Sequence, residues 1–295
     1  MGKDLYENSP LAKELFEKAN DILGYRITDI MFEGTDEDLR QTKVTQPAVF
    51  LHSVISALCM GDAFQPEMTA GHSLGEFSAL VAAGALSFED GLKLVYARAM
   101  AMQKACEAQP STMAAIIALP DEKVEEICAS VAAEGEVCVA ANYNCPGQVS
   151  CAGNAGEIDA FCEAIKAAGG RAVKLPVSGA FHTPYMKDVE PVLRTALEKM
   201  PLQAPQIPVY ANRTAGLYPA DREGITSLLS EQVCHAVRWE DTLRAMAADG
   251  IDTFVEVGAG ATLTGFVRRT LPDATALTVN DFPSYEAVLK ELLGD

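Results

Sequence analysis

The segment Gly-His-Ser-Leu-Gly at positions 71–75 constrains the fold of this chain more than any other feature of the sequence. It has the pattern Gly-x-Ser-x-Gly, which is typical of the sharp strand-to-helix turn called the nucleophile elbow. Such a turn exposes the hydroxyl of Ser73 and directs the backbone N–H of Leu74 toward a developing oxyanion. Residues 68–71 predict the strand, and the apolar positions after residue 75 predict the helix. An ordinary turn is the alternative interpretation, because the bare pattern occurs by chance in roughly one chain of this size in ten.

The chain as a whole predicts an α/β fold with an α/β-hydrolase-like parallel-sheet core, because strands and helices alternate outside residues 110–178. We expect helices at 10–23, 47–60, 88–107, 239–250 and 285–293, and strands at 207–212, 253–257 and 276–279. Residues 110–178 predict the order β-α-β-β-α-β of a ferredoxin-like subdomain. The expected organisation is a large subdomain of residues 1–109 and 179–295, with the small subdomain, residues 110–178, inserted into it.

The charge balance excludes several classes of partner. The chain carries 23 Lys and Arg against 41 Asp and Glu, a net charge of −18, which argues against binding to nucleic acid or to an anionic membrane. The eight cysteines contain no Cys-x-x-Cys pair, so we expect neither a zinc site nor a disulfide scaffold. The first residues lack the apolar core of a signal peptide, and every apolar run is too short to cross a bilayer. These features predict a cytoplasmic protein without a metal.

A serine nucleophile requires a base, and the chain has four histidines. His182 is the best candidate, because it lies in a loop of small residues directly after the predicted insertion. His52 lies within an apolar helix and is expected to be a core residue. The sharp turn should direct His72 away from Ser73, and His235 is expected to be structural.

Arg98 is a further candidate, within the helix expected at 88–107. Its neighbours at helical spacing are all apolar, namely Leu94, Val95, Ala101 and Met102. A guanidinium in such surroundings needs an anion from elsewhere. Arg98 therefore predicts a clamp for a substrate carboxylate. The alternative is a side chain that reaches solvent or pairs with a distant Asp or Glu.

Several motifs occur in an order that resembles the family of malonyl-CoA:acyl carrier protein transacylases, over essentially the whole chain. They are Gly-His-Ser-Leu-Gly-Glu at 71–76, Arg98 with Met102 and Gln103, Gly-Ala-Phe-His-Thr at 179–183, and Glu-Val-Gly-Ala-Gly at 256–260. Thr-Gln-Pro at 45–47 and Asn-Tyr-Asn at 142–144 are also similar to that family. Each motif is weak alone, but the combination is highly specific.

The resemblance implies a transfer in two steps. Ser73 would attack the thioester of malonyl-CoA, with His182 as general base. The malonyl-serine would then pass its acyl group to the phosphopantetheine thiol of acyl carrier protein, for fatty-acid synthesis. Arg98 would bind the malonyl carboxylate, the N–H of Leu74 would contribute to the oxyanion hole, and the backbone carbonyl of Gln232 would orient the histidine.

The resemblance also implies an acyl pocket formed by Gln46, Met102 and Phe181, in which Phe181 is similar to the malonyl-selective pattern. It implies a monomer that binds malonyl-CoA and acyl carrier protein and uses no metal and no redox cofactor. An acidic carrier would need a basic patch on this acidic chain. The candidates for such a patch are Arg171, Lys174, Arg268 and Arg269.

The chain departs from the family pattern at its start. The family opens with a hydrophobic strand and a Gly-Gln-Gly loop that supplies a second oxyanion donor, and its next segment resembles residues 1–6 here. The resemblance therefore implies that the strand and the loop are missing, which would expose a sheet edge and cost ~10²–10³ in turnover. A start placed at an internal Met and a true short form with weakened catalysis are the two explanations.

Two other functions remain open at this point. A serine esterase or thioesterase of the α/β-hydrolase class would use water as acceptor, but it predicts a histidine near the C-terminus, whereas His182 lies in mid-chain. A non-catalytic protein that binds acyl carrier protein is the second alternative, and the missing N-terminal loop is its only support.

Overall fold

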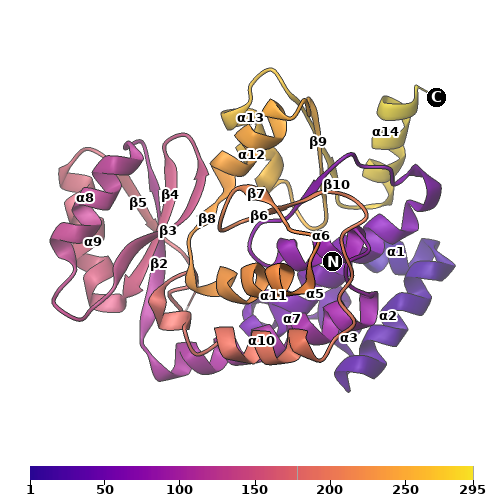
Figure 1. Ribbon diagram of the computed structural model, residues 1–295, viewed down its shortest axis with the longest axis horizontal. Coiled ribbons are helices and arrows are strands. Elements are labelled where there is room, and N and C mark those ends of the chain that lie inside the picture. Colours follow the sequence, from indigo (N-terminus) through magenta and orange to yellow (C-terminus); the bar gives the residue numbers. More distant parts are fainter. Residues whose placement is uncertain (178, 295) are drawn as a thin grey trace.

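A computed structural model describes residues 1–177 and 179–294 of the chain (Figure 1). Its helices are α1 (Lys3–Asn8), α2 (Pro10–Leu23), α3 (Ile27–Glu33), α4 (Asp36–Arg40), α5 (Thr42–Cys59), α6 (Gly75–Ala82), α7 (Phe88–Ala108), α8 (Asp121–Val131), α9 (Ala155–Ala167), α10 (Glu190–Glu198), α11 (Arg222–Glu231), α12 (Trp239–Ala248), α13 (Thr262–Thr270) and α14 (Phe282–Leu293). Its strands are β1 (Thr69–Ala70), β2 (Ser111–Ile117), β3 (Cys138–Cys145), β4 (Gln148–Asn154), β5 (Arg171–Lys174), β6 (Val209–Ala211), β7 (Gly216–Leu217), β8 (Val237–Arg238), β9 (Thr253–Val257) and β10 (Thr275–Val279). Short 3-10 helices are η1 (Gly61–Ala63), η2 (Pro184–Met186) and η3 (Gln232–Cys234).

A five-stranded sheet with the order β5-β2-β4-β3-β8 lies at one end of the molecule (Figure 1). Within it β2 pairs antiparallel with β4 and β5, and β3 pairs antiparallel with β4. Helices α8 and α9 cover one face, where strand residues such as Ile116 and Val149 pack with Ile158 and Phe161. The elements from β2 to β5 follow the β-α-β-β-α-β order that the sequence predicts. The division into subdomains stays a prediction, and its boundary residue 178 and final residue 295 lie outside the described residues.

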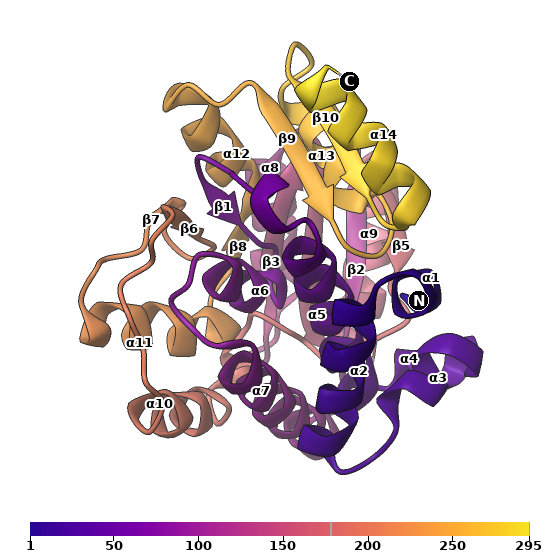
Figure 2. The same ribbon diagram turned by 90° about the vertical axis from the view of Figure 1, so that its right-hand side faces the viewer.

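The other strands form two separate sheets (Figure 2). In one, β1 pairs parallel with β6, which pairs antiparallel with β7, and in the other β9 pairs parallel with β10. The parallel pairing expected for the core is therefore divided between two separate sheets, one of which also contains an antiparallel pair. A cavity of about 970 Å³ lies between β1 and β9 and is lined also by α5, α6 and α14.

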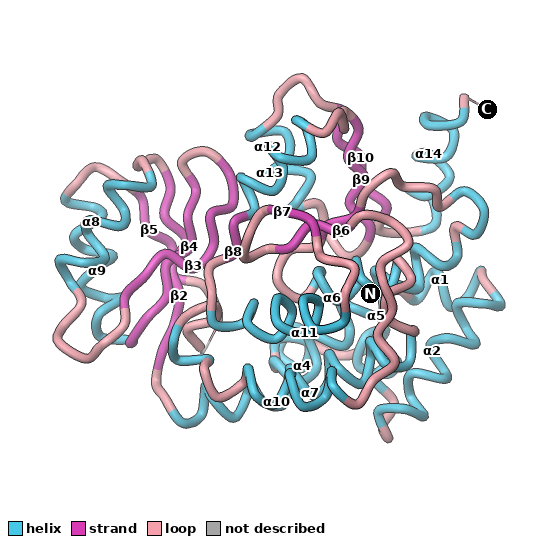
Figure 3. The backbone as a smooth tube through the Cα atoms, in the orientation of Figure 1, coloured by secondary structure: helices cyan, strands magenta, loops and turns pink. Residues whose placement is uncertain are grey.

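The largest apolar core lies among α2, α5, α6 and α7, in the mainly helical part of the molecule (Figure 3). Its fully buried aromatic residues include Phe16, Phe50 and Phe77. Helix α7 begins at an N-cap, Ser87, whose hydroxyl accepts a hydrogen bond from the backbone N–H of Asp90. This core fixes α7 against α5 and α6, and it thereby positions the side chains that α7 directs toward the turn after β1.

The expected start of one helix at residue 47 is wrong, because α5 begins at Thr42. Pro47 lies inside α5, where its missing N–H removes one backbone hydrogen bond without ending the helix. The sequence patterns also missed α1, α3, α4, α10 and α11, which have only five to ten residues each. Among the described residues, no helix is both long enough and apolar enough to cross a membrane.

Candidate active site

Ser73 lies in the turn between β1 and α6 with a φ of 53°, in the left-handed region of backbone conformation. A residue with a side chain occupies that region only where its surroundings hold it there. Asn212, which is fully buried after β6, does so from both sides of the turn: its Oδ1 accepts from the Ser73 N–H at 2.6 Å, and its Nδ2 donates to the Gly71 carbonyl at 2.6 Å. Sequence reasoning missed Asn212, although a polar residue directly after a buried strand was an available signal.

The two glycines of the elbow have different roles. A Cβ on Gly71 would lie 1.9 Å from the backbone carbonyl of Gly75, so a side chain there would collide with the turn itself. A Cβ on Gly75 would have no heavy atom within 4 Å, and the φ of Gly75 is not positive. The turn therefore requires a glycine on steric grounds only at position 71.

His182 lies next to Ser73, with 2.7 Å between its Nε2 and the serine Oγ. Its Nδ1 faces two backbone carbonyls, those of Gln232 at 3.0 Å and His235 at 3.2 Å. Because both are acceptors, Nδ1 carries the proton and Nε2 is free to accept the serine hydroxyl. Burial, reinforced by the charge of Arg98, lowers the pKa of His182 to about 3, so the imidazole is neutral at physiological pH.

Arg98 is 1% exposed and points from α7 to the same serine. Its Nη2 donates to the Ser73 Oγ at 3.1 Å and to the Gln232 Oε1 at 3.2 Å, and its Nη1 donates to the Gln46 Oε1 at 2.6 Å. The Phe77 ring centroid lies 5.4 Å from the guanidinium carbon. Burial lowers the pKa of Arg98 to about 10, which still leaves it charged at neutral pH. Among the described residues, no carboxylate lies within 4.0 Å of this charge.

The structure brings the other predicted site residues to the same place. The Nε2 of Gln46 lies 3.3 Å from the Met102 sulfur, so these two residues form one wall beside Arg98. Phe181 is half-buried and lines the cavity that also contains Ser73. The backbone N–H of Leu74 donates to no acceptor in the described part of the chain and is available to a ligand.

Glu76, on the first turn of α6, is a buried carboxylate that sequence reasoning did not select. It accepts hydrogen bonds from the Tyr218 hydroxyl at 2.6 Å, the Asn212 N–H at 3.1 Å and the Gln232 Nε2 at 2.7 Å. Burial raises the pKa of Glu76 to about 7, against the opposing effect of these donors. The available signal was a charged residue on an otherwise apolar helix that starts at the predicted nucleophile.

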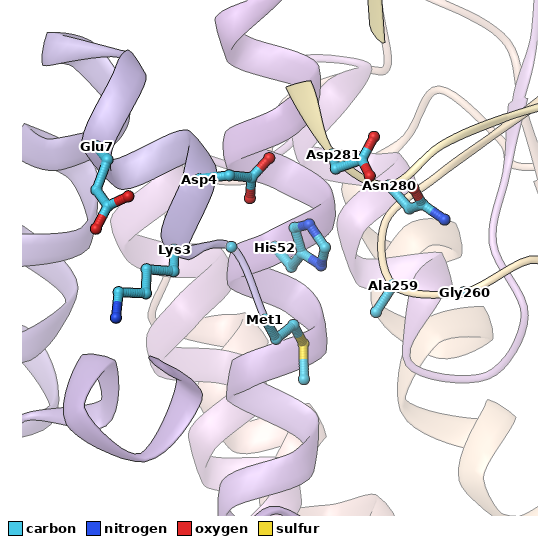
Figure 4. A pocket seen from close by; sticks show the side chains of 10 residues that line it. Met1, Lys3, Asp4, Glu7, His52, Ala259, Gly260, Asn280 and Asp281 are labelled. Carbon is cyan, nitrogen blue, oxygen red and sulfur yellow. The ribbon is translucent and has the colours of Figure 1, made fainter. Parts of the chain in front are cut away.

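The remaining histidines lie outside the reacting group. The Nε2 of His72 lies 2.8 Å from the Asn144 Oδ1, and the ring packs edge-on to Trp239, away from the serine hydroxyl. His52 is 3% exposed and lines a second cavity beside Met1 (Figure 4), where its ring nitrogens have no hydrogen-bond partner among the described residues. His235 takes part only through its backbone carbonyl, as described above.

The basic residues proposed for carrier binding are partly engaged within the chain. Lys174 forms an ion pair with Asp159, and Arg269 donates to the Gln148 Oε1 at 2.7 Å. Arg268 donates to the Ala276 carbonyl at 3.1 Å. The described residues contain no group of three or more His, Cys, Asp or Glu side chains arranged to hold a metal ion.

The steric difference between the two glycines predicts different effects on stability. Gly71→Ala should lower the free energy of unfolding by more than about 2 kcal/mol, because the turn must open to admit the methyl group. Gly75→Ala should change it by less than about 1 kcal/mol. Urea denaturation of both variants tests this, and equal stabilities would contradict the assignment.

Comparison with known proteins agrees with this geometry. Residues 1–289 match the family model of the acyl transferase domain. The chain is 36% identical over 294 residues to the malonyl CoA-acyl carrier protein transacylase of Bacillus subtilis, covering 99% of this chain and 92% of the relative. Among solved structures, the acyl-carrier-protein S-malonyltransferase of Bartonella henselae has a TM-score of 0.94 at 39% identity, covering 100% of this chain and 95% of that one.

A second solved structure contains a partner. It is a malonyl-transacylase in complex with its type II PKS acyl-carrier protein, with a TM-score of 0.94 at 34% identity, covering 99% of this chain and 94% of that one. The family model, the identities and the structural similarity all extend over nearly the whole chain. The chain therefore belongs to the acyl transferase family and, within it, to the malonyl CoA-acyl carrier protein transacylases.

Proposed function

We propose that this acyltransferase moves the malonyl group from malonyl-CoA to the phosphopantetheine thiol of acyl carrier protein through a malonyl-serine intermediate, for fatty-acid synthesis. One observation carries the proposal. The hydroxyl of Ser73 lies between a neutral imidazole at 2.7 Å and a buried guanidinium at 3.1 Å. The imidazole can take the proton of the serine hydroxyl as the oxygen attacks the acyl carbonyl. The guanidinium can bind an acyl group that itself carries a negative charge.

In the first half-reaction the Ser73 Oγ attacks the thioester carbonyl while His182 Nε2 takes the hydroxyl proton. The carbonyls of Gln232 and His235 hold the Nδ1–H, so the imidazole is oriented by backbone rather than by a carboxylate. The N–H of Leu74 donates to the oxyanion of the tetrahedral intermediate. When this intermediate collapses, the thiolate of CoA leaves and receives the proton from His182.

The acyl group is selected by its free carboxylate. Arg98 provides the cation in a site where water is excluded, so a bound carboxylate forms charge-assisted hydrogen bonds there. Gln46 and Met102 form the wall beside the guanidinium, and Phe181 limits the space for substituents on the acyl chain. A hydrolase acting on uncharged acyl esters would have no use for the buried charge of Arg98.

In the second half-reaction the phosphopantetheine thiol of the carrier gives its proton to His182 and attacks the malonyl-serine ester. Serine then leaves with that proton, and the enzyme returns to its starting state. Malonyl-CoA and the carrier use one site in turn, which gives ping-pong kinetics. The proposal includes a monomeric cytoplasmic enzyme without a cofactor, which binds malonyl-CoA and the carrier as partners and neither nucleic acid nor membrane.

Intact-protein mass spectrometry tests the acyl-enzyme. After brief incubation with malonyl-CoA, the parent chain should gain the mass of one malonyl group, because Ser73 forms an ester that persists without an acceptor. The Ser73→Ala chain should gain nothing, and addition of holo acyl carrier protein should return the parent to its original mass. A gain that persists in Ser73→Ala, or none in either chain, would contradict the proposal.

The pH dependence tests the role of His182. A base acts in its neutral form, so a pKa lowered from 6.5 to about 3 extends activity toward acid. At saturating malonyl-CoA the rate of malonyl-serine formation should change less than about threefold between pH 7 and pH 5. A histidine with an ordinary pKa of 6.5 would lose roughly 25-fold in its neutral fraction, and hence in rate, over that range. Rapid-quench measurement of malonyl-serine formation at several pH values tests this. A rate that falls with an apparent pKa near 6.5 as the pH is lowered would contradict the assignment.

A further inference from the structure

The positive charge of Arg98 has no carboxylate bonded directly to it among the described residues, and the buried acid connected to it is one side chain away. The guanidinium has hydrogen bonds to Gln46, Ser73 and Gln232 but none to a carboxylate among the described residues. Glu76 is connected to the guanidinium through the Gln232 side chain alone. The carboxylate of Glu76 accepts a hydrogen bond from the Gln232 Nε2, and the Gln232 Oε1 accepts one from Arg98. Both charged side chains are 1% exposed, so solvent screens neither of them.

The Gln232 side chain can transmit the charge of Glu76 because its orientation is fixed. Its Nε2 donates to the Glu76 Oε2 at 2.7 Å and to the Ser73 carbonyl at 2.6 Å, and its Oε1 accepts from Arg98 at 3.2 Å. An ionised carboxylate only accepts hydrogen bonds, so it favours this orientation of the amide over the flipped one. Glu76, Gln232 and Arg98 thus form one buried chain of donors and acceptors that ends at the reactive serine.

We propose that Glu76 is the counter-charge of Arg98 in the empty site, and that binding of a substrate carboxylate to Arg98 is coupled to the uptake of one proton by Glu76. The proposal rests on the proposed function, since it takes the malonyl carboxylate as the ligand of Arg98. The balance is simple: the site gains one negative charge from the substrate and loses one when a solvent proton neutralises Glu76. Its net charge is then unchanged by binding.

Two buried carboxylates that share one guanidinium explain why a proton is taken up. An uncompensated charge in a buried site is costly, and a carboxyl group avoids the cost by binding a proton. The titratable groups that face Glu76 are Tyr218 and Arg98, and its other partners, Asn212 and Gln232, are neutral amides. Because burial already raises the pKa of Glu76 to about 7, a second negative charge nearby is sufficient to protonate it near neutral pH.

Calorimetric titration of the Ser73→Ala chain measures this coupling. The substitution prevents acyl transfer, so only binding is observed, and repeating the titration in buffers of different ionisation enthalpy gives the number of protons taken up. Acetyl-CoA is the matched control, because it carries the same CoA and no acyl carboxylate. We expect malonyl-CoA to exceed acetyl-CoA by close to one proton at pH 8 and by little at pH 6, where Glu76 is already protonated.

Two further substitutions in the Ser73→Ala chain identify the group. Glu76→Gln should abolish the difference between the two thioesters. Tyr218→Phe removes a hydrogen bond that stabilises the ionised carboxylate, so uptake should persist but begin at a higher pH. If Glu76→Gln does not fold, the Tyr218→Phe chain decides, because an unshifted pH range contradicts the proposal.

The outcomes separate this proposal from the proposed function. Equal proton uptake with the two thioesters at pH 8, or an excess that persists in Glu76→Gln, would overturn the coupling. If the parent chain still formed malonyl-serine in that case, the transferase function would stand. A parent chain that formed no malonyl-serine would remove the function and the coupling together.

Discussion

The buried charge of Arg98 is the interaction on which the rest of the site depends. A guanidinium at 1% exposure is costly unless its donors are matched, and here three neutral oxygen acceptors pair with Nη1 and Nη2, while Nε has no partner among the described residues. Its charge contributes to the low pKa of His182 and opposes the effect of burial on Glu76. The site is therefore arranged around a cation that is hydrogen-bonded and still able to receive an anion.

The second requirement is a serine held in a strained turn. The positive φ of Ser73 is maintained by Asn212, which directly follows β6, and by Gln232, whose side-chain Nε2 donates to the Ser73 carbonyl. Both residues also donate to Glu76, Asn212 through its backbone N–H and Gln232 through its Nε2. The backbone carbonyl of Gln232 contacts His182 and its Oε1 accepts from Arg98, so these two residues connect the elbow, the base and the cation. This connection explains how His182 and Arg98, from two separate parts of the chain, reach the Ser73 hydroxyl at 2.7 and 3.1 Å.

The sequence predicted what depends on local pattern. The elbow, the long helix α7 and the β-α-β-β-α-β segment follow from periodicity and turn residues, and His182 was selected from its loop of small residues. The family resemblance added Gln46 and Gln232. Asn212 and Glu76 each carried a local signal of burial, but their partners could not be predicted in this way, because those contacts depend on strands and helices that meet only in the folded chain. The cavity between β1 and β9 likewise depends on how two parallel pairs are placed in space, which periodicity does not specify.

The most direct test of this account compares the rates at which the parent chain and the Arg98→Ala chain form malonyl-serine and acetyl-serine. If the buried guanidinium binds the acyl carboxylate, removing it should lower the malonyl rate at least about 100-fold more than the acetyl rate, because a charge-assisted contact to a buried anion is lost. A fall by the same factor for both thioesters would mean that Arg98 supports the structure of the elbow and does not select the substrate.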